Sequence, residues 1–502
     1  MRRGLSLILL LLLSCSVFSQ EHPFAKKFPV IDAWFDSLLK EWNIPGLALG
    51  IVYKDQLIYG KGYGYRDLEK KLPVETTTLF PIASNTKLFT ATAACMLDQE
   101  GKLNIDRPVK NYLPSINFNN DELTAKVTLH DMLSHRTGLP RYDGIWLNAT
   151  FSRKDLVSKI AYMKPQYGFR EAYIYNNMMF SGAGLVMEQV TGMSWEEIIR
   201  QKLFAPLGMG ASCFTAEEME KYGNYSHAYF ETDSTKRLLP KKFEAQSEAL
   251  GPAGTIKSSI EDMSHWMIAQ LNKGIYKGRQ VIPSKVIAQT LIPNVISDKV
   301  GRWDELSNSL YCLGRSIQTY KGLKITSHTG SIDGFYSQLL FVPQHQLGVF
   351  VVFNAVEAGS LRSVIALPVI DRLLGLSLTP WAHRYRQSYV FEKARGKKFV
   401  DSLKSLQVKN TSPSHPLSSY AGTYTNAIYG TAKIELVNGE LVFVFRRQRS
   451  PLKHFHYDQF VTEEKQSDAP EFRLQFMINN KGDIDRISMR PYGDPLTDFI
   501  KQ

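Results

Sequence analysis

Apolar β segments stand at both ends of the first 380 residues, and the sequence between them reads mainly as helices and loops. Residues 47–53 and 56–62 flank a Lys54-Asp55 turn and predict a hairpin. Residues 335–343 and 347–354 form two further strong β segments. Strands so far apart in the chain predict one sheet that is built from both ends and covered by helices on both faces.

The segment Ser84-Asn-Thr-Lys87 places a hydroxyl and an amine three positions apart. The apolar run 87–97 predicts a buried helix, and residues three apart on a helix share a face. The Lys87 side chain can therefore reach the Ser84 hydroxyl and activate it as a nucleophile. The first turn of a helix also presents free N–H groups and the positive end of the dipole, so the Ser84 amide can help to hold an oxyanion.

A single S-x-x-K match is usually a coincidence, and the chain contains two more, at Ser37 and Ser450. Ser37 lies in an amphipathic stretch that is typical of a surface helix. Ser450 is followed by Pro451 in a strand-rich region. Neither has partner motifs at a useful spacing, so Ser84 is the candidate nucleophile.

Two later motifs accompany Ser84. Tyr175-Asn-Asn177 leads into an apolar helix that ends at Thr191-Gly192, a helix-stop signal. His328-Thr-Gly330 reads as a strand edge whose glycine permits close approach of another backbone. Taken alone, the tyrosine would be a packing residue and the histidine a satisfied surface residue. Three motifs in this order, separated by long stretches, argue against coincidence.

Together the motifs resemble those of the serine β-lactamase and penicillin-binding-protein superfamily, and more closely its class C-like branch of D-aminopeptidases and esterases. Phrases similar to this family extend from about Phe24 to Leu378, among them 43–50, 129–140 and 251–263. The resemblance implies a domain over residues 20–380 with an α/β (α+β) sandwich of the β-lactamase/transpeptidase type. In that fold an antiparallel sheet is covered by helices on both faces.

Carried over to this chain, the resemblance implies that Ser84 is the acylated nucleophile and Lys87 its neighbouring proton acceptor. Tyr175 would exchange a proton with Ser84 or with the leaving group. The backbone N–H groups of Ser84 and Ser331 would form the oxyanion hole, which lowers the barrier to acyl transfer by several kcal/mol. The sequence leaves open which of Lys87 and Tyr175 is the base.

The resemblance also implies the substrate-binding residues Asn177, His328, Thr329 and Gly330. The usual third motif begins with a lysine that binds a substrate carboxylate, and this chain has His328 there. An imidazole with a pKa near 6.5 is mostly neutral at pH 7 and does not replace that charge. The departure argues against an efficient β-lactamase or D,D-carboxypeptidase, and it fits the D-aminopeptidases and esterases of the family.

The first nineteen residues predict an export signal. Met1-Arg-Arg-Gly is a basic start, residues 5–13 form an apolar core too short to span a bilayer, and Ser19 lies at a small-residue cleavage site. We therefore expect residues 1–19 to be removed and the protein to be periplasmic or extracellular. A second reading stays open, because Leu12-Leu-Ser-Cys15 resembles a lipoprotein cleavage box that would anchor the chain at Cys15.

The net charge is +12, and the excess basic residues are distributed along the whole chain. A nucleic-acid partner would need a recognition fold, and the sequence shows none, so the charge indicates solvated surface or attraction to anionic envelope polymers or lipids. The 11 histidines include no His-Glu-x-x-His or similar ligand cluster. We expect no metal and no cofactor, a small-molecule or peptide substrate, and leave cell-envelope association and homo-oligomerisation open.

The composition and the expected secondary structure change after Pro380. Residues 381–410 are charged and compatible with a helix, and 411–416 is a breaker, so 381–416 is predicted to be a linker. Residues 417–502 contain short strands and an Asn438-Gly439 hairpin turn, which predict a small all-β barrel. This segment resembles the lipocalin-like appendage of some family members. We favour a passive stabilising role over substrate gating or oligomerisation.

The sequence thus predicts an exported serine hydrolase that forms an acyl-enzyme at Ser84. Its expected substrates are small peptides, with D-amino acids among them, or esters. One alternative is a β-lactamase or D,D-carboxypeptidase of the penicillin-binding-protein type. The other is a ligand-binding relative without catalysis.

Overall fold

The computed structural model describes residues 23–149, 151–232, 236–241, 248–298, 302–462 and 471–502. The predicted signal peptide (1–19) and the candidate lipid-anchor residue Cys15 lie outside these ranges. No helix within them is long and apolar enough to cross a membrane.

The region before Pro380 is built on one antiparallel sheet, as the β segments at its two ends predict. β1 (Gly46–Tyr53) pairs with β15 (Leu347–Phe353), which joins the start of the region to its end. Within the described residues nine strands follow the order β10 (Val295–Ile296), β11 (Leu306–Tyr311), β12 (Ser316–Tyr320), β13 (Leu323–Ile332), β14 (Phe335–Val342), β15, β1, β2 (Gln56–Asp67) and β3 (Leu72–Pro73).

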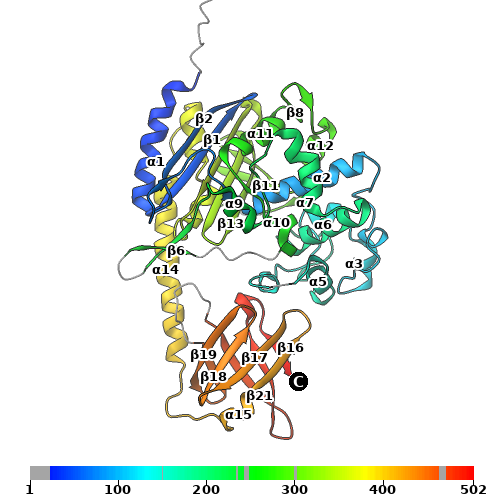
Figure 1. Cartoon of the computed structure of the whole chain (residues 1–502), viewed down its shortest axis with the longest axis vertical. Coiled ribbons are helices and arrows are strands. Elements are labelled where there is room, and N and C mark those ends of the chain that lie inside the picture. Colours follow the sequence, from blue (N-terminus) through cyan, green and yellow to red (C-terminus); the bar gives the residue numbers. More distant parts are fainter. Residues whose placement is uncertain (1–22, 150, 233–235, 242–247, 299–301, 463–470) are drawn as a thin grey trace, which may run out of the picture.

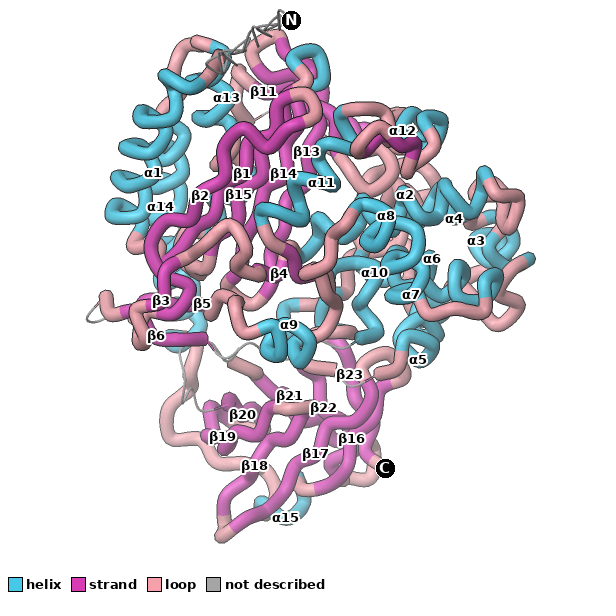
Figure 2. Tube along the Cα trace, turned by 45° about the horizontal axis from the view of Figure 1, so that its top comes forward, coloured by secondary structure: helices cyan, strands magenta, loops and turns pink. Residues whose placement is uncertain are grey.

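Helices cover both faces of this sheet, so the predicted sandwich is confirmed (Figure 2). On one face, α1 (Phe28–Trp42) and α13 (Leu367–Leu374) pack on the strands through apolar residues such as Phe35 and Ile370. On the other face, α11 (Ile260–Leu271) lies against β1, β2 and β15. The apolar side chains of β1 alternate between the two cores, as the period of a strand requires.

The middle of the chain forms a helical lobe beside the sheet. Its helices are α2 (Thr86–Gln99), α3 (Asp121–Lys126), α4 (Leu129–Leu133), α5 (Arg153–Ser158), α6 (Asn177–Thr191), α7 (Trp195–Ile199), α8 (Ala205–Leu207), α9 (Ala216–Tyr222), α10 (Gly251–Gly254) and α12 (Ser284–Gln289). Short strands lie between them: β4 (Phe80–Pro81), β5 (Ala228–Glu231), β6 (Leu238–Lys241), β7 (Lys257–Ser258), β8 (Ile275–Tyr276) and β9 (Arg279–Gln280).

Local signals set the ends of α6. The Asn176 side chain caps its start by accepting a hydrogen bond from the Met178 amide at 2.8 Å. Gly192 ends it in the left-handed region at φ 70°. The apolar stretch 360–376 forms two elements, η9 (Gly359–Ser363) and α13. Pro368 stands in the first turn of α13, where a proline begins a helix.

The stretch predicted as a linker contains one long helix, α14 (Trp381–Ser405), which leads from the sheet region to the C-terminal strands (Figure 1). Among its described residues only Trp381 is buried, and residues 391–402 are exposed throughout. The short α15 (Leu417–Tyr420) then precedes the barrel.

The C-terminal strands close into an antiparallel barrel of eight, as predicted. Aromatic side chains, among them Phe443, Phe460, Phe476 and Phe499, are fully buried and fill its interior. The Asn438-Gly439 turn has φ 53° and 84°, the left-handed values that a two-residue hairpin needs. The strands are β16 (Gly422–Asn426), β17 (Gly430–Val437), β18 (Glu440–Phe445), β19 (Gln448–His456), β20 (Gln459–Thr462), β21 (Arg473–Ile478), β22 (Ile484–Met489) and β23 (Thr497–Lys501).

Candidate active site

Ser84 lies in a tight turn, η2 (Ala83–Asn85), that runs directly into α2. The turn is anchored to β14: Asn85 Nδ2 donates to Ser337 Oγ at 2.8 Å, and Ser337 Oγ donates to the Ile82 carbonyl at 2.9 Å. Ala83 has φ 50°, which a non-glycine residue adopts only under constraint from its surroundings. The nucleophile is therefore presented by a strained, firmly held turn.

Gly330 explains how β13 reaches this turn. A Cβ atom at this position would lie 2.2 Å from the Ile82 carbonyl oxygen and 2.3 Å from Ser337 Oγ. The absence of a side chain lets β13 pack directly on η2, as the glycine of the third motif predicts. The pairing of β13 with β12 ends at Ser327, so the backbone of residues 328–331 has no β12 partner where it passes Ser84.

Lys87 is fully buried beneath Ser84, and its amine has three oxygen neighbours. Nζ lies 3.1 Å from Ser84 Oγ, 2.8 Å from Asn177 Oδ1 and 2.6 Å from the Ala253 carbonyl oxygen. The amide and carbonyl oxygens can only accept, so they take two N–H groups of Lys87. In the neutral amine, the remaining direction is a lone pair that faces the Ser84 hydroxyl.

Burial lowers the pKa of Lys87 well below its ordinary value, and the positive charge of Arg141 lowers it further. Tyr175 responds in the opposite sense: burial raises the pKa of its hydroxyl, which is hydrogen-bonded to Ser84. The Lys87 amine lies 4.8 Å from the centre of the Tyr175 ring. The site thus favours an uncharged lysine beside a protonated tyrosine.

Asn177 is oriented by a residue that the sequence motifs do not include. Its Nδ2 donates to Asp143 Oδ1 at 3.1 Å, which turns the amide oxygen toward Lys87. Asp143 also pairs with Arg141 and accepts from Trp146 Nε1 at 3.0 Å. Arg141, Asp143 and Trp146 belong to the loop around η4 (Asp143–Ile145).

His328 is buried in β13, and both ring nitrogens have protein partners. Nδ1 donates to its neighbour's carbonyl, Thr329 O, at 2.7 Å, so Nε2 accepts from the Tyr311 hydroxyl at 3.1 Å. Burial and the nearby Lys87 lower the pKa of His328 to about 3. The imidazole is neutral at pH 7, as its ordinary pKa predicts.

A pocket of about 590 Å³ opens above these residues. The predicted residues Ser84, Tyr175, Asn177, His328, Thr329 and Ser331 line it, while Lys87 and Gly330 lie beneath its wall. Aromatic side chains form much of the remaining wall: Trp146, Tyr173, Trp303, Tyr311 and Tyr385. Three arginines also face it: Arg141, Arg302 and Arg362. The structure therefore gathers all the predicted site residues in one place.

Comparison with known proteins identifies the family. The family model described as Beta-lactamase matches residues 31–367, more than half of the chain. The chain belongs to the Beta-lactamase family. The superfamily resemblance seen in the three motifs is thereby confirmed. A second model, described as a domain of unknown function (DUF3471), matches residues 406–501, which include the whole barrel.

Relatives of this Beta-lactamase family member are distant. Unguisins hydrolase ungD of Aspergillus violaceofuscus is 26% identical over 428 residues, which are 79% of this chain and 75% of that protein. Protein flp of Staphylococcus aureus is 27% identical over 329 residues, 64% of this chain and 62% of that protein.

Solved structures show the same fold at lower identity. The octameric penicillin-binding protein homologue from Pyrococcus abyssi aligns with a TM-score of 0.61 at 22% identity and covers 94% of this chain and all of that chain. SurE aligns with a TM-score of 0.58 at 17% identity, over 95% of this chain and 99% of that chain.

The two other S-x-x-K matches are not assembled in this Beta-lactamase family member. Ser37 and Lys40 are both exposed on α1. Ser450 and Lys453 lie in β19, where residues three apart point to opposite faces. Only Ser84 has its lysine within hydrogen-bonding distance among these three.

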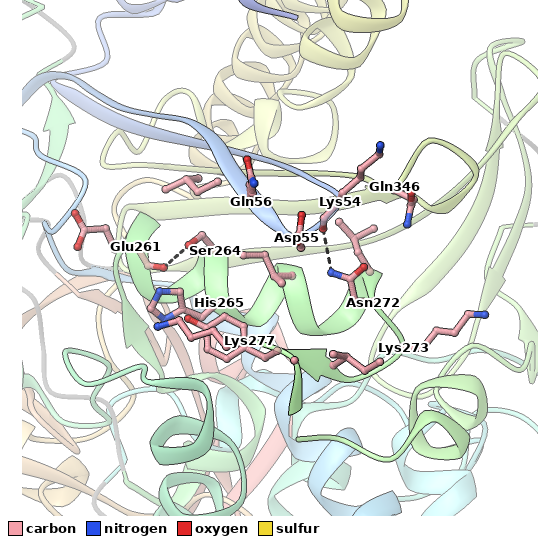
Figure 3. A pocket seen from close by; sticks show the side chains of 16 residues that line it. Lys54, Asp55, Gln56, Glu261, Ser264, His265, Asn272, Lys273, Lys277 and Gln346 are labelled. Atoms are coloured by element: carbon pink, nitrogen blue, oxygen red, sulfur yellow. Dashed lines mark hydrogen bonds between the residues drawn. The ribbon is translucent and has the colours of Figure 1, made fainter. Parts of the chain in front are cut away.

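A larger hollow, of about 1120 Å³, lies elsewhere on the surface (Figure 3). It is formed by the tip of the β1–β2 hairpin and by α11 and β8. Some of its polar side chains are hydrogen-bonded to backbone carbonyls. Ser264 donates to the Glu261 carbonyl at 2.6 Å, and Asn272 donates to the Lys54 carbonyl at 3.2 Å. None of the predicted site residues lines it.

Within the described ranges no group of three or more His, Cys, Asp or Glu side chains is placed to hold a metal ion.

The functional groups that sequence reasoning missed are Arg141, Asp143 and the carbonyl of Ala253. Ala253 stands inside a family-like phrase, but a backbone carbonyl has no residue signature. Arg141 and Asp143 directly follow the phrase 129–140, and only the fold brings them to Asn177.

Proposed function

We propose that this chain is an exported serine hydrolase of the class C-like branch, which acylates Ser84 with small peptides, D-amino-acid peptides among them, or with esters. One observation carries the proposal. Two carbonyl oxygens, of the Asn177 side chain and the Ala253 backbone, accept the two N–H bonds of the buried Lys87 amine, and its third substituent position points at Ser84 Oγ. A lone pair in that position can accept the serine proton.

Lys87 is the base in this proposal. It takes the proton of Ser84 Oγ as the oxygen attacks the substrate carbonyl carbon. The backbone N–H groups of Ser84 and Ser331 hold the resulting oxyanion. The tetrahedral intermediate then expels its amine or alcohol, which takes a proton from the protonated Tyr175, and the proton on Lys87 restores the tyrosine. Water hydrolyses the acyl ester by the reverse sequence of proton transfers.

The neutral His328 supports substrates that do not depend on a carboxylate at the third motif. The relative named as a hydrolase of unguisins supports hydrolysis as the reaction class.

Export to the periplasm or the exterior rests on residues 1–19 alone. N-terminal analysis of the mature protein tests it: a start at Gln20 supports signal cleavage, and a lipid-modified Cys15 supports the anchored form.

A second candidate function is a β-lactamase or D,D-carboxypeptidase, and one structural observation favours keeping it. Arg141 and Arg362 line the pocket, and both charges act on Tyr175. An arginine could bind the substrate carboxylate that His328 does not attract.

Association into homo-oligomers is a further proposal, prompted by the octameric description of a structural neighbour, and light scattering tests it.

Covalent labelling tests the proposed chemistry. A fluorophosphonate should label the wild type and the matched controls Ser37→Ala and Ser450→Ala, and it should not label Ser84→Ala. Labelled penicillin should turn over poorly. Rapid turnover of penicillin would favour the second candidate, and no labelling of folded wild type by either probe would favour a binding protein without catalysis.

A further inference from the structure

Arg446, at the turn between β18 and β19, reaches from the barrel to the loop that includes η4. Its guanidinium donates to three backbone carbonyls, those of Gly144, Ile145 and Leu147, in the active-site loop of residues 141–148. Nη1 lies 2.5 Å from the Gly144 oxygen and also contacts the Leu147 oxygen, and Nη2 lies 2.8 Å from the Ile145 oxygen. A planar fork of donors suits this task, and a lysine would not span the three acceptors.

Arg446 is half-buried at this interface. Burial lowers its pKa to about 10, which still leaves it charged at pH 7. Its guanidinium carbon lies 5.7 Å from the Tyr492 ring and 5.8 Å from the Phe151 ring, one ring from each side of the interface. The two terminal nitrogens are therefore held by loop carbonyls and the guanidinium is flanked by aromatic rings, while Nε is buried without a hydrogen-bond partner among the described residues.

A second barrel segment, η10 (Pro491–Gly493), holds the same loop. The carboxylate of Asp494 is hydrogen-bonded to the Gly144 amide and accepts from the Tyr429 hydroxyl at 3.0 Å. A Cβ atom at Gly144 would lie 2.5 Å from both Asp494 Oδ2 and the Pro491 oxygen. The loop and the barrel are thus fitted closely enough that only glycine is accommodated there.

The opposite side of this loop faces the nucleophile. Asp143 orients the Asn177 amide, and Arg141 lies 5.0 Å from the Tyr175 ring centre. The charges of Arg141 and Asp143 both act on Lys87, the first lowering and the second raising its pKa. One short loop therefore has the barrel on one side and the proton-transfer groups on the other.

We propose that Arg446 is a positioning residue that holds loop 141–148 in place, so that the C-terminal barrel completes the active site. The chain of contacts runs from Arg446 through the loop backbone to Asp143, then through Asn177 to Lys87. This assignment goes beyond a passive stabilising role for the barrel. That Arg446 holds the loop is independent of the proposed function, whereas the effect of the loop on the Ser84 reaction rests on it.

Displacement of the loop has a defined effect on Lys87. Its surroundings consist of Ser84, Asn177 and Tyr175, the charges of Arg141 and Asp143, and the neutral imidazoles of His135 and His328. If the loop moves away, water enters and both charges recede; the loss of burial and of the lowering effect of Arg141 outweighs the loss of the smaller raising effect of Asp143. The pKa of Lys87 then rises, so the acid limb of any Ser84 reaction moves to higher pH.

Two measurements on the full-length protein test the proposal. The first is hydrogen exchange of backbone amides in residues 141–149. The second is the fluorophosphonate labelling rate as a function of pH. In Arg446→Met we expect faster exchange in this segment, labelling at pH 7 that is about 10- to 100-fold slower, and an acid limb shifted upward. Arg446→Lys should restore little of the rate, because the charge alone does not hold three carbonyls.

Arg449→Met is the matched control, since Arg449 lies in the same hairpin but pairs with Glu435 at the surface. It should behave like wild type. Gly144→Ala disturbs the same interface from the loop side and should reproduce the Arg446→Met profile, which keeps the test open if Arg446→Met does not fold.

The outcomes are distinguishable. Unchanged exchange in folded Arg446→Met would overturn the positioning role. Faster exchange with an unchanged rate and pH profile would overturn the link to catalysis. If wild type is not labelled at all, the proposed hydrolase function fails, while the exchange measurement still decides whether Arg446 holds the loop.

Discussion

Asp143 accepts a hydrogen bond from Asn177 Nδ2 at 3.1 Å and thereby decides which end of that amide faces Lys87. Without Asp143, the amide nitrogen could turn toward the lysine amine, and two donors would then face each other. The carboxylate itself lies behind the amide, so Lys87 gains an acceptor without an adjacent negative charge. This arrangement keeps the amine close to Ser84, while burial and Arg141 lower the pKa of Lys87 by more than Asp143 raises it.

Replacing that amide by a carboxylate should move the pH dependence. In Asn177→Asp, a negative charge would stand at the position 2.8 Å from Lys87 Nζ and stabilise the ammonium form. The pKa of Lys87 then rises, so the acid limb of fluorophosphonate labelling should move up by about 1–3 pH units. Asn177→Leu, which removes the amide without adding charge, should slow labelling without this upward shift. Equal acid limbs in Asn177→Asp and wild type would contradict Lys87 as the base.

Loss of the Tyr175 hydroxyl should slow the reaction while leaving its acid limb in place. Burial raises the pKa of Tyr175, so this residue donates a proton and does not titrate on the acid side. We expect Tyr175→Phe to lower kcat by about two to four orders of magnitude with the best ester or peptide substrate found. Tyr222→Phe, an exposed tyrosine on α9, is the control. Near-normal kcat in Tyr175→Phe would show that the second motif has no role in proton transfer.

A methyl group at Gly330 should destabilise the protein and displace the nucleophile. The added carbon would lie 2.2 Å from the Ile82 carbonyl oxygen, a backbone atom that cannot move without shifting η2. Overpacking of this kind costs about 1–3 kcal/mol, so Gly330→Ala should lower the Tm and slow labelling of Ser84. Gly396→Ala is the matched control, because no atom lies near that position on exposed α14 and alanine favours a helix. A wild-type Tm and labelling rate in Gly330→Ala would refute the close approach of β13 to η2.

Arg362 separates the two candidate functions. If it binds a substrate carboxylate, the wild type should prefer free-acid over amidated substrates, and Arg362→Met should reduce the ratio of their kcat/KM values about tenfold or more. Arg372→Met is a suitable control, since Arg372 makes a comparable bond to a nearby carbonyl but lies on α13 beside Trp34. A ratio near one in wild type would remove the support for the β-lactamase or carboxypeptidase alternative.

Local sequence determined much of the fold and the centre of the site. The hairpin turns at Lys54-Asp55 and Asn438-Gly439, and the helix stop at Gly192, act through backbone preferences of neighbouring residues. The three-residue spacing of Ser84 and Lys87 likewise places both on one face of one short segment. Such features are readable because the interacting groups are close in the chain.

Only the tertiary structure decided the protonation partners and the role of the barrel. The Ala253 carbonyl, which holds Lys87, is chemically the same as any other backbone carbonyl in the sequence. Arg446 and Arg449 stand three positions apart with equal side chains, yet one donates to carbonyls of the active-site loop and the other pairs with Glu435 at the surface. Contacts between segments far apart in the chain depend on how the lobes pack, and no local preference encodes that packing.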